Sequence, residues 1–135
     1  MLTETIAIQV EGSLPGARLC IYIQEKSREL RIKERPLILL CPGGGYEWTS
    51  DREAEPMAVQ FLAMGYHVAV LRYSCAPAVF PTALLELAEA VASRLRRQGM
   101  KAGEVQLTVK NGDFQEYQRQ CRLEPAVCDA RSLYK

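Results

Sequence analysis

The sequence predicts an α/β fold in which an N-terminal antiparallel strand pair leads into a parallel sheet. Two apolar runs carry this prediction: residues 36–41 end at three consecutive glycines, and residues 66–71 follow a segment of helical periodicity. A second helical segment comes next. The order strand, helix, strand, helix is a βαβα unit, whose right-handed crossover makes the two apolar strands parallel neighbours.

Two segments near the N-terminus alternate between apolar and polar residues with a period of two. They are residues 5–10 and 19–24, and the turn-forming residues 12–16 separate them. This alternation is typical of strands, and a turn between two such runs favours antiparallel pairing. The highly charged residues 25–35 are interpreted as a solvated connection.

The first helical segment follows the glycines, and its start has two interpretations. Ser50 and Glu53 fit a capping box, although the charged residues 51–53 could equally line a substrate entrance. Pro56 is unfavourable inside a helix. Either the Ser50 segment is a separate turn, or the main helix starts just before Pro56, which then lies in its first turn. Gly65 is expected to close this helix.

The second helical segment covers residues 81–97. Its apolar side chains Leu84, Ala88, Val91 and Leu95 recur at helical spacing. Arginines gather in its last turn, where cations interact favourably with the helix dipole. This helix completes the βαβα unit.

The pattern changes after the second helix. Residues 105–109 alternate ahead of Asn111-Gly112, a pair that favours a hairpin turn, but residues 113–135 show no sustained apolar period. We therefore divide the chain into a partial α/β domain over residues 1–99 and a divergent tail over residues 100–135. The sequence leaves open whether that tail is well ordered.

Composition excludes several classes of function. The 135 residues include 17 Lys and Arg against 16 Asp and Glu, and a net charge of +1 gives no general attraction to nucleic acid or acidic lipid. No apolar run approaches the ~20 residues of a membrane span, and the N-terminus lacks the pattern of a secretory signal. We expect a cytoplasmic protein with neither nucleic acid nor a membrane as partner.

The five cysteines are interpreted as free thiols. Their number is odd, their spacing is wide, and no C-x-x-C pair indicates a zinc or redox site. Cys75 has no evident base or cation that would activate it as a nucleophile. No metal site and no cofactor are expected.

The three glycines are the most informative feature of the sequence. Gly43, Gly44 and Gly45 follow the first apolar strand at its carboxyl end, where open α/β sheets bind ligands. Three glycines allow backbone N–H groups to face an incoming oxygen, although a tight strand–helix turn is the simpler alternative. The loop matches neither G-x-x-x-x-G-K-[ST] nor G-x-G-x-x-G, so a nucleotide-binding domain is a weaker hypothesis.

Three segments of the chain resemble the N-terminal half of α/β-hydrolase esterases of the acetyl-esterase and acetylxylan-esterase-like type. They are R-P-L-I-L-L-C-P-G-G-G-Y at residues 35–46, T-S-D-R-E-A-E-P at 49–56 and G-Y-H-V-A-V-L-R-Y-S at 65–74. The likeness covers roughly residues 1–98, and it implies a partial α/β-hydrolase sheet.

The resemblance also implies a site. In that family the loop after the third strand carries an H-G-G-G-type motif whose backbone N–H groups form half of the oxyanion hole. Here Pro42 stands where histidine often stands. The implied oxyanion-hole or substrate-binding residues are Gly43, Gly44, Gly45 and Tyr46, and the amides around the last three are the expected oxyanion donors.

The Ser-Asp-His triad of that family is not found in the chain. Such enzymes need a G-x-S-x-G nucleophile elbow, then an acid, then a histidine. None of the six serines lies in that context, and the G-S-L-P-G segment at residues 12–16 is a near miss in the first hairpin. His67, the only histidine, precedes the place where an elbow belongs and is interpreted as a strand-entry residue with a satisfied ring. No catalytic residue is identified.

The sequence thus predicts a truncated carboxylic ester hydrolase that retains its oxyanion loop and lacks its triad. The implied substrates are small acyl esters, with acetylated sugars as candidates, and the chain alone is expected to be inactive. Loss of the likeness after Gln98 suggests a frameshift or a misjoined gene end. The alternative is a non-catalytic α/β module that binds a partner chain or forms a homo-oligomer through an exposed sheet edge.

Overall fold

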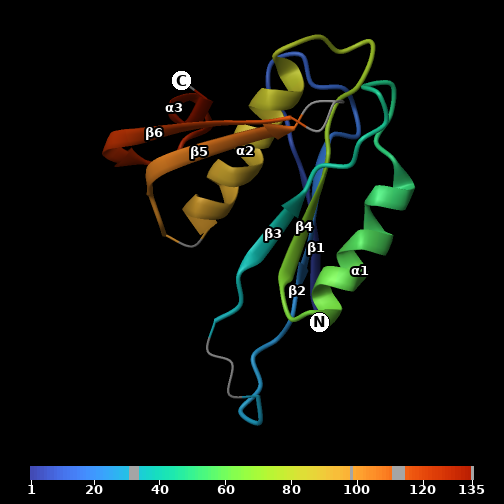
Figure 1. Cartoon of the computed structure of the whole chain (residues 1–135), viewed down its shortest axis with the longest axis vertical. Coiled ribbons are helices and arrows are strands. Elements are labelled where there is room, and N and C mark those ends of the chain that lie inside the picture. The colour runs from blue at the N-terminus through green and yellow to red at the C-terminus, as the bar shows by residue number, and fades with distance from the viewer. Residues whose placement is uncertain (31–33, 98, 111–114, 135) are drawn as a thin grey trace. The chain divides into compact units, whose positions relative to one another are not determined.

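The computed structural model describes residues 1–30, 34–97, 99–110 and 115–134. The chain divides into two compact units, Met1–Leu87 and Ala88–Lys135. Figure 1 shows the elements of both units. The division falls within the long helix α2, which covers Thr82–Arg97 and confirms the predicted second helix.

The first unit contains a four-stranded sheet in the order β1-β2-β4-β3. Its strands are β1 (Leu2–Ala7), β2 (Arg18–Ile23), β3 (Leu37–Leu40) and β4 (His67–Arg72). β2 pairs antiparallel with both β1 and β4, whereas β3 and β4 are parallel. The predicted fold class is confirmed: an N-terminal antiparallel pair leads into a partly parallel sheet.

β4 is the most buried strand of this sheet. Val68, Ala69, Val70 and Leu71 are each at most 2% exposed. Successive side chains of a strand point to opposite faces, so both faces of β4 are covered. The strand predicted from this apolar run is therefore confirmed, and it lies between β2 and β3.

β3 differs from its prediction. Its sequence indicates a strand buried on both faces, but Leu37–Leu40 are only half-buried and Cys41 is exposed. Within the described residues β3 pairs with β4 alone, so its other edge has no neighbouring strand. A strand at the edge of a sheet has fewer neighbours to cover its side chains, which explains the difference.

The segment after the glycine loop forms two short helices. A 3₁₀ turn, η1, covers Asp51–Glu53, and α1 covers Glu55–Ala63 with a proline in its first turn. Both interpretations of the helix start are confirmed: the segment after Ser50 forms a separate turn, and the main helix starts just before Pro56. The capping box is wrong: no side chain caps η1 at Ser50, and the Glu53 carboxylate instead accepts a hydrogen bond from the Gly43 amide.

Helix α1 packs against the sheet of the first unit (Figure 1). Ala54 and Ala58 are buried in one cluster with Val68 and Val70 of β4. Their small side chains allow the helix to lie close to the strand. The helix ends as predicted at Gly65, whose φ of +96° is in the left-handed region that favours glycine.

A buried carboxylate links three parts of the first unit. Glu86 of α2 is 0% exposed, and its Oε1 accepts hydrogen bonds from the hydroxyls of Ser13 at 2.7 Å and Ser74 at 2.5 Å. Its Oε2 accepts one from the Ser74 amide at 2.6 Å. The Ser74 hydroxyl accepts a further bond from the Leu14 amide. The β1–β2 turn, the segment after β4 and the start of α2 are thereby joined through satisfied polar groups.

The second unit contains a two-stranded sheet. Besides the later part of α2 it comprises β5 (Ala102–Lys110), β6 (Glu116–Val127) and α3 (Ala130–Tyr134). β5 and β6 are antiparallel. The strand predicted from the alternation before Asn111-Gly112 is confirmed, β6 is not predicted by the sequence, and the proposed turn itself lies outside the described residues.

We predict that Glu86→Ala lowers the urea midpoint of unfolding of the first unit. The substitution leaves two hydroxyls and one amide without their acceptor, and each unsatisfied buried group costs about 1–3 kcal/mol. Urea titration followed by Trp48 fluorescence measures the change. The matched control, Glu11→Ala on the exposed β1–β2 turn, is expected to change the midpoint little. Equal effects of the two substitutions would contradict this role for Glu86.

Candidate active-site loop and adjoining pocket

The glycine loop leaves the sheet at the carboxyl end of β3. β3 and β4 are parallel, so the segment that follows β4 leaves at the same edge. Two hydrogen bonds join these segments: the Ala76 amide donates to the Tyr46 carbonyl at 2.8 Å, and the Tyr73 hydroxyl donates to the Pro42 carbonyl at 2.6 Å. Burial raises the pKa of the Tyr73 phenol, which keeps this donor protonated.

Gly43 is held through both of its backbone polar groups. Its N–H donates to Oε2 of Glu53 at 2.7 Å, and its carbonyl accepts from the Ser50 amide at 2.7 Å. A Cβ at this position would lie 3.0 Å from the same carboxylate oxygen. The Gly43 amide is therefore committed to Glu53 and is not open to a ligand in this conformation.

The next three amides are placed differently. Gly44, Gly45 and Tyr46 have φ values of +146°, +66° and +68°. A Cβ on Gly44 would lie 2.0 Å from the Trp48 carbonyl oxygen, so only glycine fits there. In the part of the chain that the structure describes, the amides of these three residues donate no hydrogen bond to another protein group. Their assignment as oxyanion donors stays a prediction.

His67 lies at the other end of the strands. It begins β4 and pairs with Leu37, the first residue of β3. Its Nδ1 accepts a hydrogen bond from the Gln24 amide at 3.1 Å. The interpretation as a strand-entry histidine with a satisfied ring is confirmed. His67 is therefore not placed to act as a base beside the glycine loop.

The serine and cysteine candidates are also not activated nucleophiles. Ser13 of the near-miss motif lies in the β1–β2 turn and donates its hydroxyl to Glu86. All five cysteines are free thiols, as interpreted from the sequence. Burial and the nearby Glu86 carboxylate raise the pKa of the Cys75 thiol, which disfavours the reactive thiolate.

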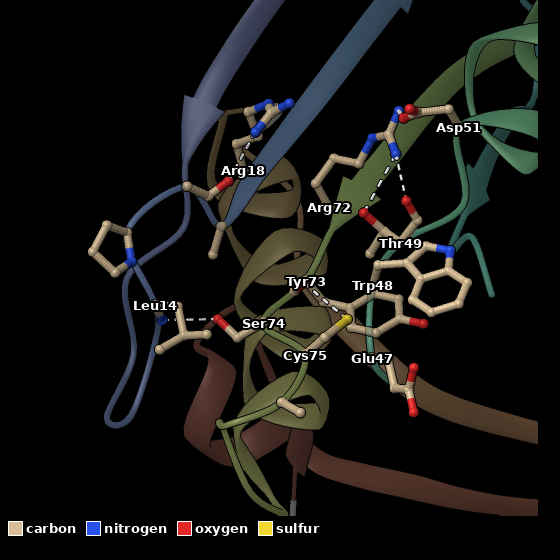
Figure 2. A pocket seen from close by; sticks show the side chains of 14 residues that line it. Leu14, Arg18, Glu47, Trp48, Thr49, Asp51, Arg72, Tyr73, Ser74 and Cys75 are labelled. Carbon is tan, nitrogen blue, oxygen red and sulfur yellow. Dashed lines mark hydrogen bonds and ion pairs between the residues drawn. The ribbon is translucent and has the colours of Figure 1, made fainter. Parts of the chain in front are cut away.

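A pocket of about 400 Å³ adjoins the glycine loop (Figure 2). Three segments of the first unit line it: residues 14–18 of the β1–β2 turn and β2, residues 47–49 with Asp51, and residues 72–76 at the end of β4. Asp51, one of the candidates for a substrate entrance, lines this pocket, whereas Arg52 and Glu53 do not.

Arg72 organises one wall of the pocket. It is 8% exposed, and its guanidinium lies 2.9 Å from carboxylate oxygens of both Asp51 and Glu55. It also donates to the Thr49 carbonyl at 3.1 Å. A buried cation needs such partners because desolvation penalises an isolated charge. Sequence reasoning missed Arg72, although a charged residue that ends a fully apolar strand is a usable signal.

The described residues can also be searched for a metal site and for a membrane-spanning helix. No group of three or more His, Cys, Asp or Glu side chains among them is placed to hold a metal ion. Within those same residues, every helix is too short or too polar to cross a membrane.

Solved structures similar to this chain are hydrolases. The α/β hydrolase MGS-M1 from a Medee basin deep-sea metagenome library is 42% identical over 73% of this chain and 40% of its own, with a TM-score of 0.64. The carboxylesterase Cest-2923 from Lactobacillus plantarum is 27% identical over 73% and 36%, with a TM-score of 0.57. An acetyl ester-xyloside bifunctional hydrolase from Caldicellulosiruptor lactoaceticus is 31% identical over 60% and 28%, with a TM-score of 0.53. No curated protein sequence matches the chain.

These likenesses support the α/β-hydrolase superfamily, and the fold matches part of the α/β-hydrolase fold. The chain spans two fifths or less of the length of each of these hydrolases. The acetyl-esterase and acetylxylan-esterase-like type stays a prediction.

A different likeness covers the end of the chain. The family model of the impB/mucB/samB family C-terminal domain matches residues 77–135, less than half of the sequence. The matched range includes α2, β5, β6 and α3. The match overlaps the end of the α/β-hydrolase-like region, and the frameshift or misjoined gene end stays a prediction. The boundary predicted between residues 99 and 100 stays a prediction.

We predict that Gly44→Ala disturbs the loop more than Gly45→Ala. The Cβ on Gly44 meets the Trp48 carbonyl, whereas a Cβ on Gly45 has no atom within 4 Å. Gly45→Ala therefore carries only the cost of a left-handed backbone, roughly 1–2 kcal/mol. The emission spectrum of Trp48, the one tryptophan of the sequence, and the urea midpoint report the two effects. Indistinguishable spectra and midpoints for the two variants would show the loop to be less confined than described.

Proposed function

We propose that the first unit supplies the oxyanion loop of a carboxylic ester hydrolase of the α/β-hydrolase type. The observation that carries this proposal is the run of three backbone amides at Gly44, Gly45 and Tyr46 that have no protein acceptor among the described residues. They lie at the carboxyl end of a parallel strand, where such sheets bind ligands. The structural likeness to a carboxylesterase supports the same class.

The amides suit the chemistry of ester hydrolysis. When a nucleophile attacks an ester, the carbonyl oxygen gains negative charge, and preorganised N–H donors stabilise that charge in the transition state. Removal of one such donor typically lowers the rate by ~10²–10³. The loop is preorganised because Glu53, Tyr73 and Ala76 hold its two ends through hydrogen bonds.

Under this proposal, the chain does not supply the serine nucleophile and the histidine base of the reaction. In the family reaction a serine attacks the ester and a histidine accepts its proton. This sequence has no G-x-S-x-G segment, and its one histidine lies at the other end of the strands. The chain alone is therefore expected to be inactive. Hydrolysis of p-nitrophenyl acetate that one serine substitution abolishes would contradict this part of the proposal.

The proposed substrates are small acyl esters, with acetylated sugars among them. Two similar solved structures are sugar-directed hydrolases by name, which supports acetylated sugars as substrates. They are the acetyl ester-xyloside bifunctional hydrolase and a sugar hydrolase from Lactococcus lactis, which is 29% identical over 72% of this chain. For the first unit the proposal needs no cofactor, nucleic acid or membrane. The five free cysteines are consistent with a cytoplasmic location, where thiols stay reduced.

The second candidate function is a non-catalytic module that pairs through β3. Within the described residues the outer edge of β3 has no neighbouring strand. An unpaired edge can accept a strand from another chain or from a second copy. Sedimentation velocity at increasing concentration distinguishes self-association from a monomer, and a monomer at high concentration counts against the homo-oligomer.

The oxyanion loop can be tested by NMR titration with ethylphosphonate, whose tetrahedral anionic oxygens imitate the developing oxyanion. We expect the amide resonances of Gly44, Gly45 and Tyr46 to shift and saturate. The Gly43 resonance is expected to shift less, because its N–H is bound to Glu53. Unchanged resonances at all three residues would refute the proposed function.

A further inference from the structure

The end of β4 is tied to the segment that follows the glycine loop. Arg72, the last residue of β4, donates from one terminal nitrogen to the Thr49 carbonyl at 3.1 Å and to the Thr49 hydroxyl at 3.3 Å (Figure 2). The four residues before Arg72 are each at most 2% exposed, so the arginine is anchored in the most buried strand of the sheet. A side chain that starts from a packed strand offers a firmer support than one on a loop.

Thr49 lies in a segment that folds back on the glycines. The next residue, Ser50, donates its amide to the Gly43 carbonyl at 2.7 Å. The preceding residue, Trp48, places its carbonyl oxygen 2.0 Å from the position that a Cβ on Gly44 would take. Both neighbours of Thr49 therefore pack against the loop backbone, and the position of Thr49 decides how closely they approach it.

The guanidinium reaches several partners at once. Its other terminal nitrogen lies 2.9 Å from carboxylate oxygens of Asp51 and Glu55. Within the described residues its Nε is buried and has no hydrogen-bond partner, which costs free energy. A lysine ammonium is a single compact charge without the fork of a guanidinium, so it cannot make both sets of contacts. Arg72→Lys thus keeps the charge beside the carboxylates, removes the unpartnered Nε–H and loses the hold on Thr49.

We propose that Arg72 is a positioning residue of the oxyanion loop. It fixes Thr49, and through the neighbours of Thr49 it holds Gly44 in the conformation that leaves the loop amides without a protein acceptor. In this role Arg72 acts through the loop backbone and does not touch the oxyanion. The connection to an oxyanion rests on the proposed ester-hydrolase function.

Native-state hydrogen exchange of the whole chain tests the hold on the loop without any ligand. The reporters are the amides of Ser50 and Glu47, which donate to the carbonyls of Gly43 and Gly44. We expect Arg72→Lys to accelerate exchange at both reporters about tenfold, the effect of losing roughly one hydrogen bond from a charged donor.

The ethylphosphonate titration then connects the hold to the oxyanion donors. We expect Arg72→Lys to bind ethylphosphonate about tenfold more weakly, because the loop must be ordered again when the anion binds. A change in overall stability alone does not predict this loss as long as the variant is folded.

Two control variants separate the hold on the loop from other effects. Arg35→Lys is the matched control, because Arg35 also donates to a backbone carbonyl, that of Gly65, but lies before the first residues of β3 and β4. It should leave both measurements unchanged. Val68→Ala opens a cavity in the cluster between β4 and α1 and lowers stability. It should lower the urea midpoint and leave the ethylphosphonate affinity unchanged.

Four results would overturn the proposal. They are unchanged exchange at the reporters in Arg72→Lys, equal acceleration in Arg35→Lys, an unaltered ethylphosphonate affinity in Arg72→Lys, and an equal loss of affinity in Val68→Ala. If the unsubstituted chain does not respond to ethylphosphonate, the proposed function fails, and the link between Arg72 and an oxyanion fails with it. Faster exchange in Arg72→Lys would then still show that the arginine holds the loop.

Discussion

The burial of β4 is the constraint on which the rest of the first unit depends. This strand is paired along both edges, and Val68–Leu71 are shielded on both faces. Its neighbours β2, β3 and α1 are held in place because each covers part of it. The apolar run ends at Arg72, and a guanidinium this close to the core needs acidic partners. Asp51 and Glu55 provide them, so the wall of the pocket follows from the burial of one strand.

The same strand positions the glycine loop. Because β3 runs parallel to β4, the chain leaves both strands at one edge of the sheet. Tyr73 and Ala76, just after β4, then reach the two ends of the loop. Gly43 is tied to Glu53, and the following glycines turn through left-handed conformations. A backbone that is held at its ends and turned in this way leaves the N–H groups of Gly44, Gly45 and Tyr46 without a protein acceptor among the described residues, as the proposed stabilisation of an oxyanion needs.

Local signals predicted most elements of this fold, whereas contacts between distant residues were not predictable. Periodicity located the strands and helices of the first unit, although β1 covers Leu2–Ala7 and not the predicted residues 5–10. Gly65 marked a helix end because the left-handed backbone conformation that favours glycine is a local requirement. Glu53 matched a capping box, but its carboxylate is bound to an amide ten residues earlier. In the sequence, Glu86 is one polar residue of an amphipathic helix. Its hydrogen-bond partner Ser13 lies 73 positions away, so the local pattern did not predict this contact. The half-buried state of β3 depends on which strands flank it, and its composition does not contain that information.

The central claim is that the loop keeps one amide for its own structure and leaves the next three for a ligand. Native-state hydrogen exchange, resolved by NMR for each amide of the loop, tests it most directly. The account predicts slow exchange at Gly43, whose N–H is bound to Glu53, and fast exchange at Gly44, Gly45 and Tyr46. Exchange at Gly43 as fast as at its neighbours, or protection of all four amides, would contradict it.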